Sequence, residues 1–86
     1  MDFWETLYTA ADNAGVPTTK IGPKLGLSRG YIAACKAQGV TPGLVNAARL
    51  LGACGYVLAA LPADQLPDGA LVIDGGAAGP GDGAGD

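Results

Sequence analysis

The side chains in this chain that can do chemistry are mainly its charged ones, and they are sorted along the sequence. All eight acidic residues lie before position 20 or after position 49, although they give the 86-residue chain a formal net charge of −3. A central segment with five basic residues and no acid presents a positive face despite the acidic total, and so favours an anionic partner over chance placement of few charges. The five basic residues are Lys20, Lys24, Arg29, Lys36 and Arg49.

Residues suited to catalysis or metal binding are scarce. The chain has no histidine, and its carboxylates lie in the flanks without the spacing of a paired acid and base. The two cysteines, Cys35 and Cys54, fall in apolar helical patterns without a CxxC motif. We therefore expect two reduced, buried thiols, no disulfide, no metal, no cofactor and no enzymatic activity.

The hydrophobic residues suit a folded globule and not a membrane protein. They make up 49% of the chain, but no apolar run approaches the length of a membrane span, which is about 18 residues. The acidic N-terminus does not resemble a signal peptide. We expect one cytoplasmic domain with no membrane partner.

The elements that must position the basic residues are helices, and the first is predicted from DFWETLYTAADNAG. Asp2 can cap it, Glu5 completes a capping box, and Gly15 supplies a left-handed stop. Its inward stripe is expected to be Trp4, Leu7, Ala11 and Ala14.

Three shorter helices are predicted to follow. The second covers about 18–25 and ends at Gly26, and Pro23 inside it is expected to kink it, shorten it or make it partly 3₁₀. Leu27 then fills the core from the turn, and Ser28 caps a third helix to about residue 38. Thr41 and Pro42 are expected to begin a fourth helix, which ends at Ala53 or Cys54.

The character of the chain changes after residue 55. The runs YVLAALP and ALVID are separated by a Pro-Asp-Gly turn signal, which predicts a β-hairpin or two short strands over 56–74. The glycine-rich end, 75–86, cannot repay its ordering entropy and is expected to be a flexible tail. The expected fold is mainly α, with a helical domain over 1–55 followed by this strand element.

A tight helix-turn-helix is indicated by one order of residue types: an apolar residue, a glycine, a second apolar residue and a serine. The stretch KLGLSRGYI, residues 24–32, resembles the helix-turn-helix of the Cro/C1 repressor-like (XRE) family, and TPxxxxxxRLLxxxGY, residues 41–56, extends the likeness. The resemblance covers about 2–55 and implies a four-helix, lambda-repressor-like domain. The CGYVLAALP segment is similar to the end of antitoxin-like and phage-repressor-like members, whose fourth helix runs into a pairing strand.

The resemblance also implies roles for individual residues. The third helix, about 28–38, would lie in the major groove while the second crosses the backbone. Base contacts would come from Ser28, Arg29, Gly30 and Ala34. Phosphate contacts would come from Thr18, Lys20, Lys24, Tyr31 and Lys36, with helix packing an equal alternative for Tyr31.

The function expected on these grounds is a sequence-specific regulator of repressor type that binds double-stranded DNA as a homodimer. The alternative is a protein-binding module on the same scaffold, such as an antitoxin that binds a toxin or a phage-encoded inhibitor of a host protein. The predicted strands carry too many large apolar groups to remain in water, which favours pairing with a second subunit. The alternative is that the hairpin folds back on the helices of its own chain and that the protein is a monomer. The predicted dimer interface is Tyr56, Leu58, Leu61, Leu71 and Ile73.

Overall fold

The structure of the protein is a computed structural model, and it describes residues 1–73. This part of the chain is all-helical and contains four helices, as the sequence predicts, and no β-strand. The helices are α1 (Phe3–Ala14), α2 (Thr18–Lys24), α3 (Tyr31–Gln38) and α4 (Leu44–Gly52).

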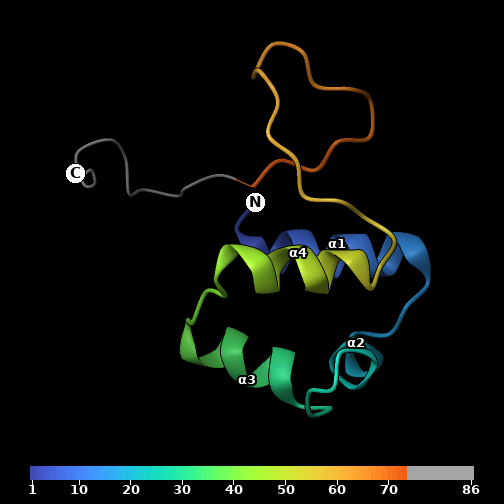
Figure 1. The fold of residues 1–86 in the computed structure, drawn as a ribbon, viewed down its shortest axis with the longest axis vertical. Helices are drawn as coiled ribbons and strands as arrows, with labels where there is room; N and C mark the ends of the chain where they lie inside the picture. Colours follow the sequence, from blue (N-terminus) through green and yellow to red (C-terminus); the bar gives the residue numbers. More distant parts are fainter. Residues whose placement is uncertain (74–86) are drawn as a thin grey trace.

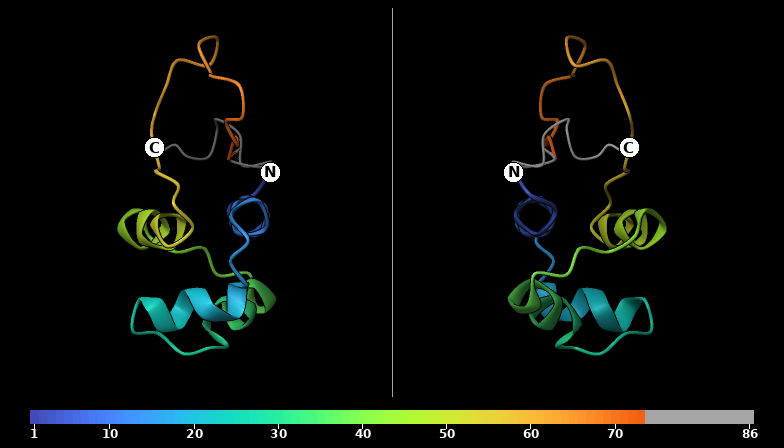
Figure 2. Two further views of the ribbon diagram at one scale, coloured as in Figure 1. Left: turned by 90° about the vertical axis from the view of Figure 1, so that its right-hand side faces the viewer. Right: turned by 90° about the vertical axis from the view of Figure 1, so that its left-hand side faces the viewer.

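The four helices form two layers. Helices α1 and α4 lie side by side and run in the same direction, and α2 and α3 pack together beneath them (Figure 1). The segment 56–73 rises from the other side of the α1/α4 layer, away from α2 and α3, in all three views (Figures 1 and 2). The layer of α2 and α3 is therefore one end of the molecule, and the irregular segment is the other.

Helix α1 begins and ends as its sequence predicts. The Asp2 carboxylate accepts a hydrogen bond from the Glu5 backbone N–H at 2.8 Å, and the Glu5 carboxylate accepts one from the Asp2 N–H at 3.0 Å. Gly15 stops the helix with a φ of 71°. The inward stripe is correct except at Ala14, which is exposed because the buried face turns toward Phe3 and Ala10.

The core lies between the two layers, and its three fully buried large side chains come from three different helices. They are Leu7 of α1, Ile21 of α2 and Leu50 of α4, while α3 contributes Ile32. Trp4 is also buried, and its indole Nε1–H donates to the Val40 carbonyl at 2.9 Å, which ties α1 to the α3–α4 connection.

Helix α2 is short, and it ends in a hydrogen-bonded turn that leads to α3. The Leu27 N–H donates to the Gly22 carbonyl at 2.8 Å and the Gly26 N–H to the Pro23 carbonyl at 3.1 Å, the paired bonds of a Schellman motif. This motif needs a left-handed residue, and Gly26 has a φ of 80°. Pro23 lies in the last turn, and α2 remains α-helical to Lys24.

The starts of α3 and α4 lie later than the sequence predicts. Ser28 does not cap α3: the helix begins at Tyr31 with Gly30 as N-cap, and Ser28 contributes only its backbone carbonyl, which accepts from the Tyr31 N–H at 3.3 Å. Likewise, Thr41 and Pro42 precede α4, whose N-cap is Gly43. In both places the Schellman turn that ends the preceding helix is followed by several residues that change the chain direction before the next helix begins.

The predicted strands over 56–73 are not formed, and Asp74 and the predicted tail 75–86 lie outside the described residues. The segment instead makes two local turns, in which the Gln65 N–H donates to the Pro62 carbonyl and the Ala70 N–H to the Pro67 carbonyl. Residues near both of its ends pack against the helical core. Of the predicted dimer residues, Tyr56, Leu58 and Leu71 are half-buried against the core, and Leu61 and Ile73 are exposed.

Candidate nucleic-acid interface

The fold separates the charges in space as well as in sequence. Lys20 and Lys24 lie on α2, Arg29 lies in the turn to α3, and Lys36 lies on α3. All are exposed, and together they populate the α2/α3 layer, with Arg49 of α4 directed toward it. The acidic residues of the described chain lie outside this layer, on α1 or its cap and in the segment 56–73, although Asp12 borders the start of α2: Asp2, Glu5, Asp12, Asp64 and Asp68.

Two of the five basic groups are already engaged within the protein. The Lys36 Nζ lies 5.6 Å from the centre of the Tyr8 ring on α1, a cation–π distance, so this ammonium turns back toward the α1/α4 layer. The Arg49 Nη2 is 3.5 Å from the Leu25 carbonyl at the end of α2. To contact a phosphate, as predicted, the Lys36 ammonium would have to give up its cation–π contact with the Tyr8 ring.

The other three basic groups face outward. The side chains of Lys20, Lys24 and Arg29 make no hydrogen bond or ion pair with another of residues 1–73. Their positive charge is not neutralised by a neighbouring carboxylate of the described chain, so it remains available to an anionic partner. These three residues, and not all five, form the outward basic surface.

The residues predicted to contact bases are brought together at one exposed corner. Ser28, Arg29 and Gly30 are consecutive in the turn before α3, and all three are exposed. Ala34 lies about one turn further along α3 and is also exposed. Arg29 is the only member of this group with a long hydrogen-bonding side chain.

The outward face of α3 is made of methyl groups. Spacing of about 100° per residue places Ala33, Ala34 and Ala37 on one face, opposite the buried Ile32, and all three are exposed. Only Ala34 is among the residues predicted from the sequence. Ala33 and Ala37 could have been predicted from YIAACKAQ by taking Ile32 as the buried residue and using the helical period to find the opposite face.

Thr18 and Tyr31, two predicted phosphate contacts, are half-buried. Tyr31 packs against the core, and burial, together with the neighbouring Cys35, raises the pKa of its phenol. Helix packing, the alternative for Tyr31 in the sequence, is therefore the role that its surroundings favour. Tyr31 is better suited to holding α3 in place than to reaching a phosphate.

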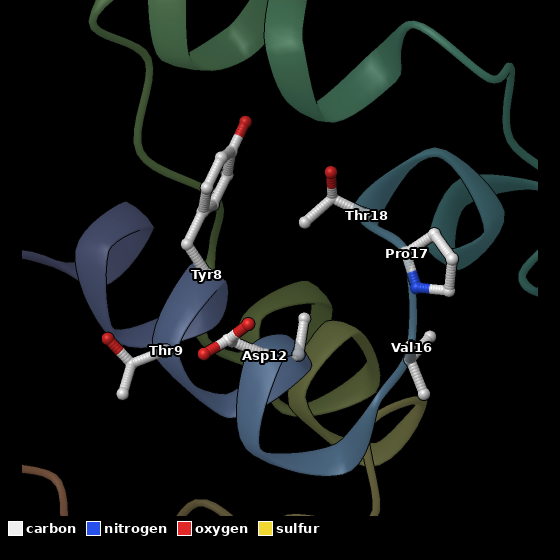
Figure 3. Close-up of a pocket in the computed structure, with 7 residues that line it drawn as sticks. Tyr8, Thr9, Asp12, Val16, Pro17 and Thr18 are labelled. Atoms are coloured by element: carbon white, nitrogen blue, oxygen red, sulfur yellow. The ribbon is translucent and has the colours of Figure 1, made fainter.

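Thr18 borders a shallow hollow between α1 and the start of α2. The hollow has a volume of about 490 Å³, and Asp12 is the one charged residue that lines it. Tyr8 and Thr18 stand on its two sides, and the Tyr8 hydroxyl points toward α3 (Figure 3). This places Thr18 on the inner side of α2, next to α1, and away from the outward basic surface.

Both cysteines carry free thiols in the structure; Cys54 is buried as expected, whereas Cys35 is only half-buried. Burial raises the pKa of the Cys54 thiol, and the charge of Lys24 opposes this effect in part. Among residues 1–73, no three His, Cys, Asp or Glu side chains gather as a metal site would require.

No helix in the described chain has the length and hydrophobicity needed to cross a membrane. Comparison with protein-family models, curated proteins and solved structures found no match to this chain.

Proposed function

We propose that this protein is a transcriptional regulator of repressor type that binds double-stranded DNA through α2, the following turn and α3. In this proposal the four helices are a lambda-repressor-like, XRE-type helix-turn-helix domain. Helix α3 lies in the major groove, and α2 crosses the backbone above it.

The observation that carries the proposal is the outward basic surface. Lys20, Lys24 and Arg29 are exposed at the end of the molecule formed by α2 and α3, and no carboxylate of the described chain pairs with them. Phosphate contacts from such residues supply most of the affinity for DNA. A chain with a net charge of −3 would be repelled by DNA without this segregation.

Two kinds of side chain are available to distinguish bases. The Arg29 guanidinium can donate two hydrogen bonds to the O6 and N7 of a guanine. The methyl groups of Ala33, Ala34 and Ala37 cannot form hydrogen bonds, but they can contact the C5 methyl group of thymine. We therefore propose that each half-site combines a guanine near the start of α3 with thymines along the helix.

The salt dependence of binding tests the phosphate contacts. If Lys20, Lys24 and Arg29 each neutralise one phosphate, the slope of log K against log salt should be about −0.9 for each contact. Lys24→Ala should weaken binding to all sequences alike and make the slope shallower by about one. Fluorescence anisotropy across a salt series measures both quantities.

The matched control is Lys36→Ala, which removes a lysine whose ammonium lies over Tyr8. It should change the slope less than Lys24→Ala does. A complex whose affinity does not depend on salt, or equal slopes for the two variants, would contradict the proposed phosphate contacts.

Replacing thymine by uracil tests the methyl face of α3. Uracil differs only by the missing C5 methyl group, so hydrogen bonding and overall charge are unchanged. Loss of methyl contacts to the three alanines should weaken binding several-fold, since each buried methyl-sized group contributes about 0.8 kcal/mol. Competition assays with thymine and uracil versions of a selected duplex provide the measurement, and equal affinities would show that α3 does not read these methyl groups.

One specific observation favours a second candidate, a protein-binding module of the antitoxin or host-inhibitor kind. A mostly apolar hollow of about 940 Å³ lies between the helices and the segment 56–73, and Asp68 is its one charged lining residue. A partner protein could bury an apolar side chain there. Absence of any salt-dependent shift of duplex DNA, including DNA from upstream of the protein's own gene, would favour this candidate.

A further inference from the structure

We infer that the hollow between the helices and the segment 56–73 binds a small amphipathic amine, with the apolar body of the ligand inside the hollow and its ammonium group at the Asp68 carboxylate. The hollow lies on the side of the α1/α4 layer away from α2 and α3 (Figure 1). The inference therefore does not depend on DNA binding by α2 and α3, and a ligand and a duplex can be bound together.

The hollow is lined from two sides by large apolar residues. On the side of the helices it is lined by Phe3 of α1 and Leu51 of α4, which are both buried. On the other side it is lined by Leu61, Leu66 and Ile73 of the segment 56–73. Its volume of about 940 Å³ lies within the range of small-molecule sites, about 300–1,000 Å³. A ligand with an apolar body fits both this size and this lining.

The segment 56–73 is attached to α1 near both of its ends, so it closes a loop of chain over the hollow (Figure 1). The Asn13 side-chain amide donates to the Tyr56 hydroxyl at 3.1 Å, and the Met1 N-terminus donates to the Val72 carbonyl at 3.4 Å. Between these attachments the segment is largely exposed and forms neither helix nor strand. Segments with few buried contacts rearrange at low cost, so this one can close on a ligand without losing either attachment.

The apolar residues that the segment contributes to the hollow are left in contact with water. Leu61 is 51% exposed, Leu66 42% and Ile73 37%. Residues 74–86 carry no side chain that could cover them, since this stretch contains only Asp, Gly, Ala and Pro. The apolar body of a ligand would remove these three side chains from water, which is the main favourable contribution to the binding of apolar molecules.

The charge of the lining selects the polar group of the ligand. Asp68 is the one charged residue that lines the hollow, and its exposed carboxylate has no partner among residues 1–73. The Met1 ammonium does not line the hollow. Helix α4 begins beside the hollow, but a helix N-terminus carries only a partial positive charge. The full negative charge of Asp68 therefore favours an ammonium group over a carboxylate.

Three compounds that share one apolar body test the inference: phenylhexylamine, phenylhexanol and phenylhexanoate. Isothermal titration calorimetry of the full chain should show saturable binding of the amine. Its affinity should be about two- to fivefold higher than that of the alcohol, which is the effect of an ion pair at an exposed position. The carboxylate should bind more weakly than the alcohol, because Asp68 repels it. Amide chemical-shift changes should fall on residues that line the hollow and not on the α2/α3 layer.

Asp68→Asn tests the charged contact. In this variant the amine and the alcohol should bind with equal affinity. The matched control is Asp64→Asn, which removes a carboxylate from the neighbouring turn of the segment, outside the lining of the hollow. Asp64→Asn should keep the preference for the amine. Equal loss of the preference in both variants would mean that the amine responds only to the overall charge, and would overturn the inference.

Leu61→Asn tests the apolar contact. It should weaken the binding of all three compounds several-fold, because Leu61 lines the hollow. The matched control is Val45→Asn, at an exposed valine of α4 outside the lining, and it should bind all three as the wild type does. Both residues are exposed, so neither change should unfold the protein, and circular dichroism checks this.

The remaining outcomes separate this inference from the proposed function. Failure of all three compounds to bind at millimolar concentration would overturn the inference and leave a partner protein as the occupant of the hollow. A chain that sediments as a dimer and binds no amine would assign the hollow to a second copy, and tighter binding of the carboxylate than of the amine would reverse the selected charge. Both results would overturn the inference. A protein that binds the amine but no duplex would support this site and remove the proposed function.

Discussion

Replacing Gly22 by alanine should destabilise the protein, although alanine is the better helix former. Gly22 is buried within α2, and a Cβ at this position would collide with the backbone carbonyl oxygen of Ser28 in the turn before α3. A backbone atom cannot move aside as the end of a flexible side chain can. The turn would have to shift, and forced overpacking of this kind costs about 1–3 kcal/mol.

Thermal unfolding followed by circular dichroism measures the effect. In a domain of this size, each kcal/mol lowers Tm by about 4–8 °C. The matched control is Gly52→Ala, at the end of α4, where a Cβ meets no atom within 4 Å. That change should be neutral or should stabilise by up to about 1 kcal/mol, as alanine does in helices.

The same change should also affect DNA binding. Ser28 and Arg29 lie in the turn that Gly22 contacts, so a displaced turn moves the start of α3 relative to α2. Even where Gly22→Ala is folded, its affinity for a selected duplex should fall. A Gly22→Ala protein that is more stable than the wild type, as Gly52→Ala can be, would show that α2 and the turn are not in this close contact.

Arg29→Ala should cause the largest loss of sequence-specific binding. Arg29 is exposed, makes no hydrogen bond or ion pair with the rest of the described chain, and is the only long donor at the start of α3. A bidentate arginine–guanine contact contributes about 1–3 kcal/mol of discrimination, which corresponds to a loss of about 5–150-fold in affinity. The preference at one base pair of each half-site should relax.

Binding of Arg29→Ala to a selected duplex and to random DNA distinguishes base reading from positioning. The loss should be large on the selected duplex and small on random DNA. Arg49→Ala serves as the control, since its guanidinium faces the Leu25 carbonyl at the end of α2. Equal losses on both duplexes would make Arg29 a phosphate contact alone, and recognition would then depend on the α3 alanines.

The sequence by itself determined the features that depend on neighbouring residues. Asp2 and Glu5 form their capping box because both partners lie within the first turn of α1. The stops at Gly15, Gly26 and Gly39 all have positive φ, a conformation that glycine adopts without strain. The number and order of the helices, and the segregation of positive charge to residues 20–49, could therefore be read without a structure.

Other features were decided only by tertiary packing. The alternating apolar runs after residue 55 predicted strands, but with no paired strand beside them, Tyr56, Leu58 and Leu71 pack on the helices instead. Lys36 belongs to the basic segment in sequence, yet Tyr8 of α1 draws its ammonium away from the outward surface. Neither outcome is visible in local sequence, because Tyr8 lies far from Lys36 along the chain, and the Tyr56 hydroxyl accepts a hydrogen bond from Asn13 of the distant α1.

At the candidate site, the start of α3 also depends on both local sequence and tertiary packing. Ser28 has the side chain of a good N-cap, but the Schellman bonds that end α2 at Gly22 and Leu27, and the close approach of Gly22 to the Ser28 carbonyl, hold it in the turn. The helix therefore begins at Tyr31. The local sequence predicted which residues form the turn. Which of them stay outside α3 was decided by the packing of α2 against the turn, because the contact between these two backbone segments fixes the path of the chain up to Tyr31.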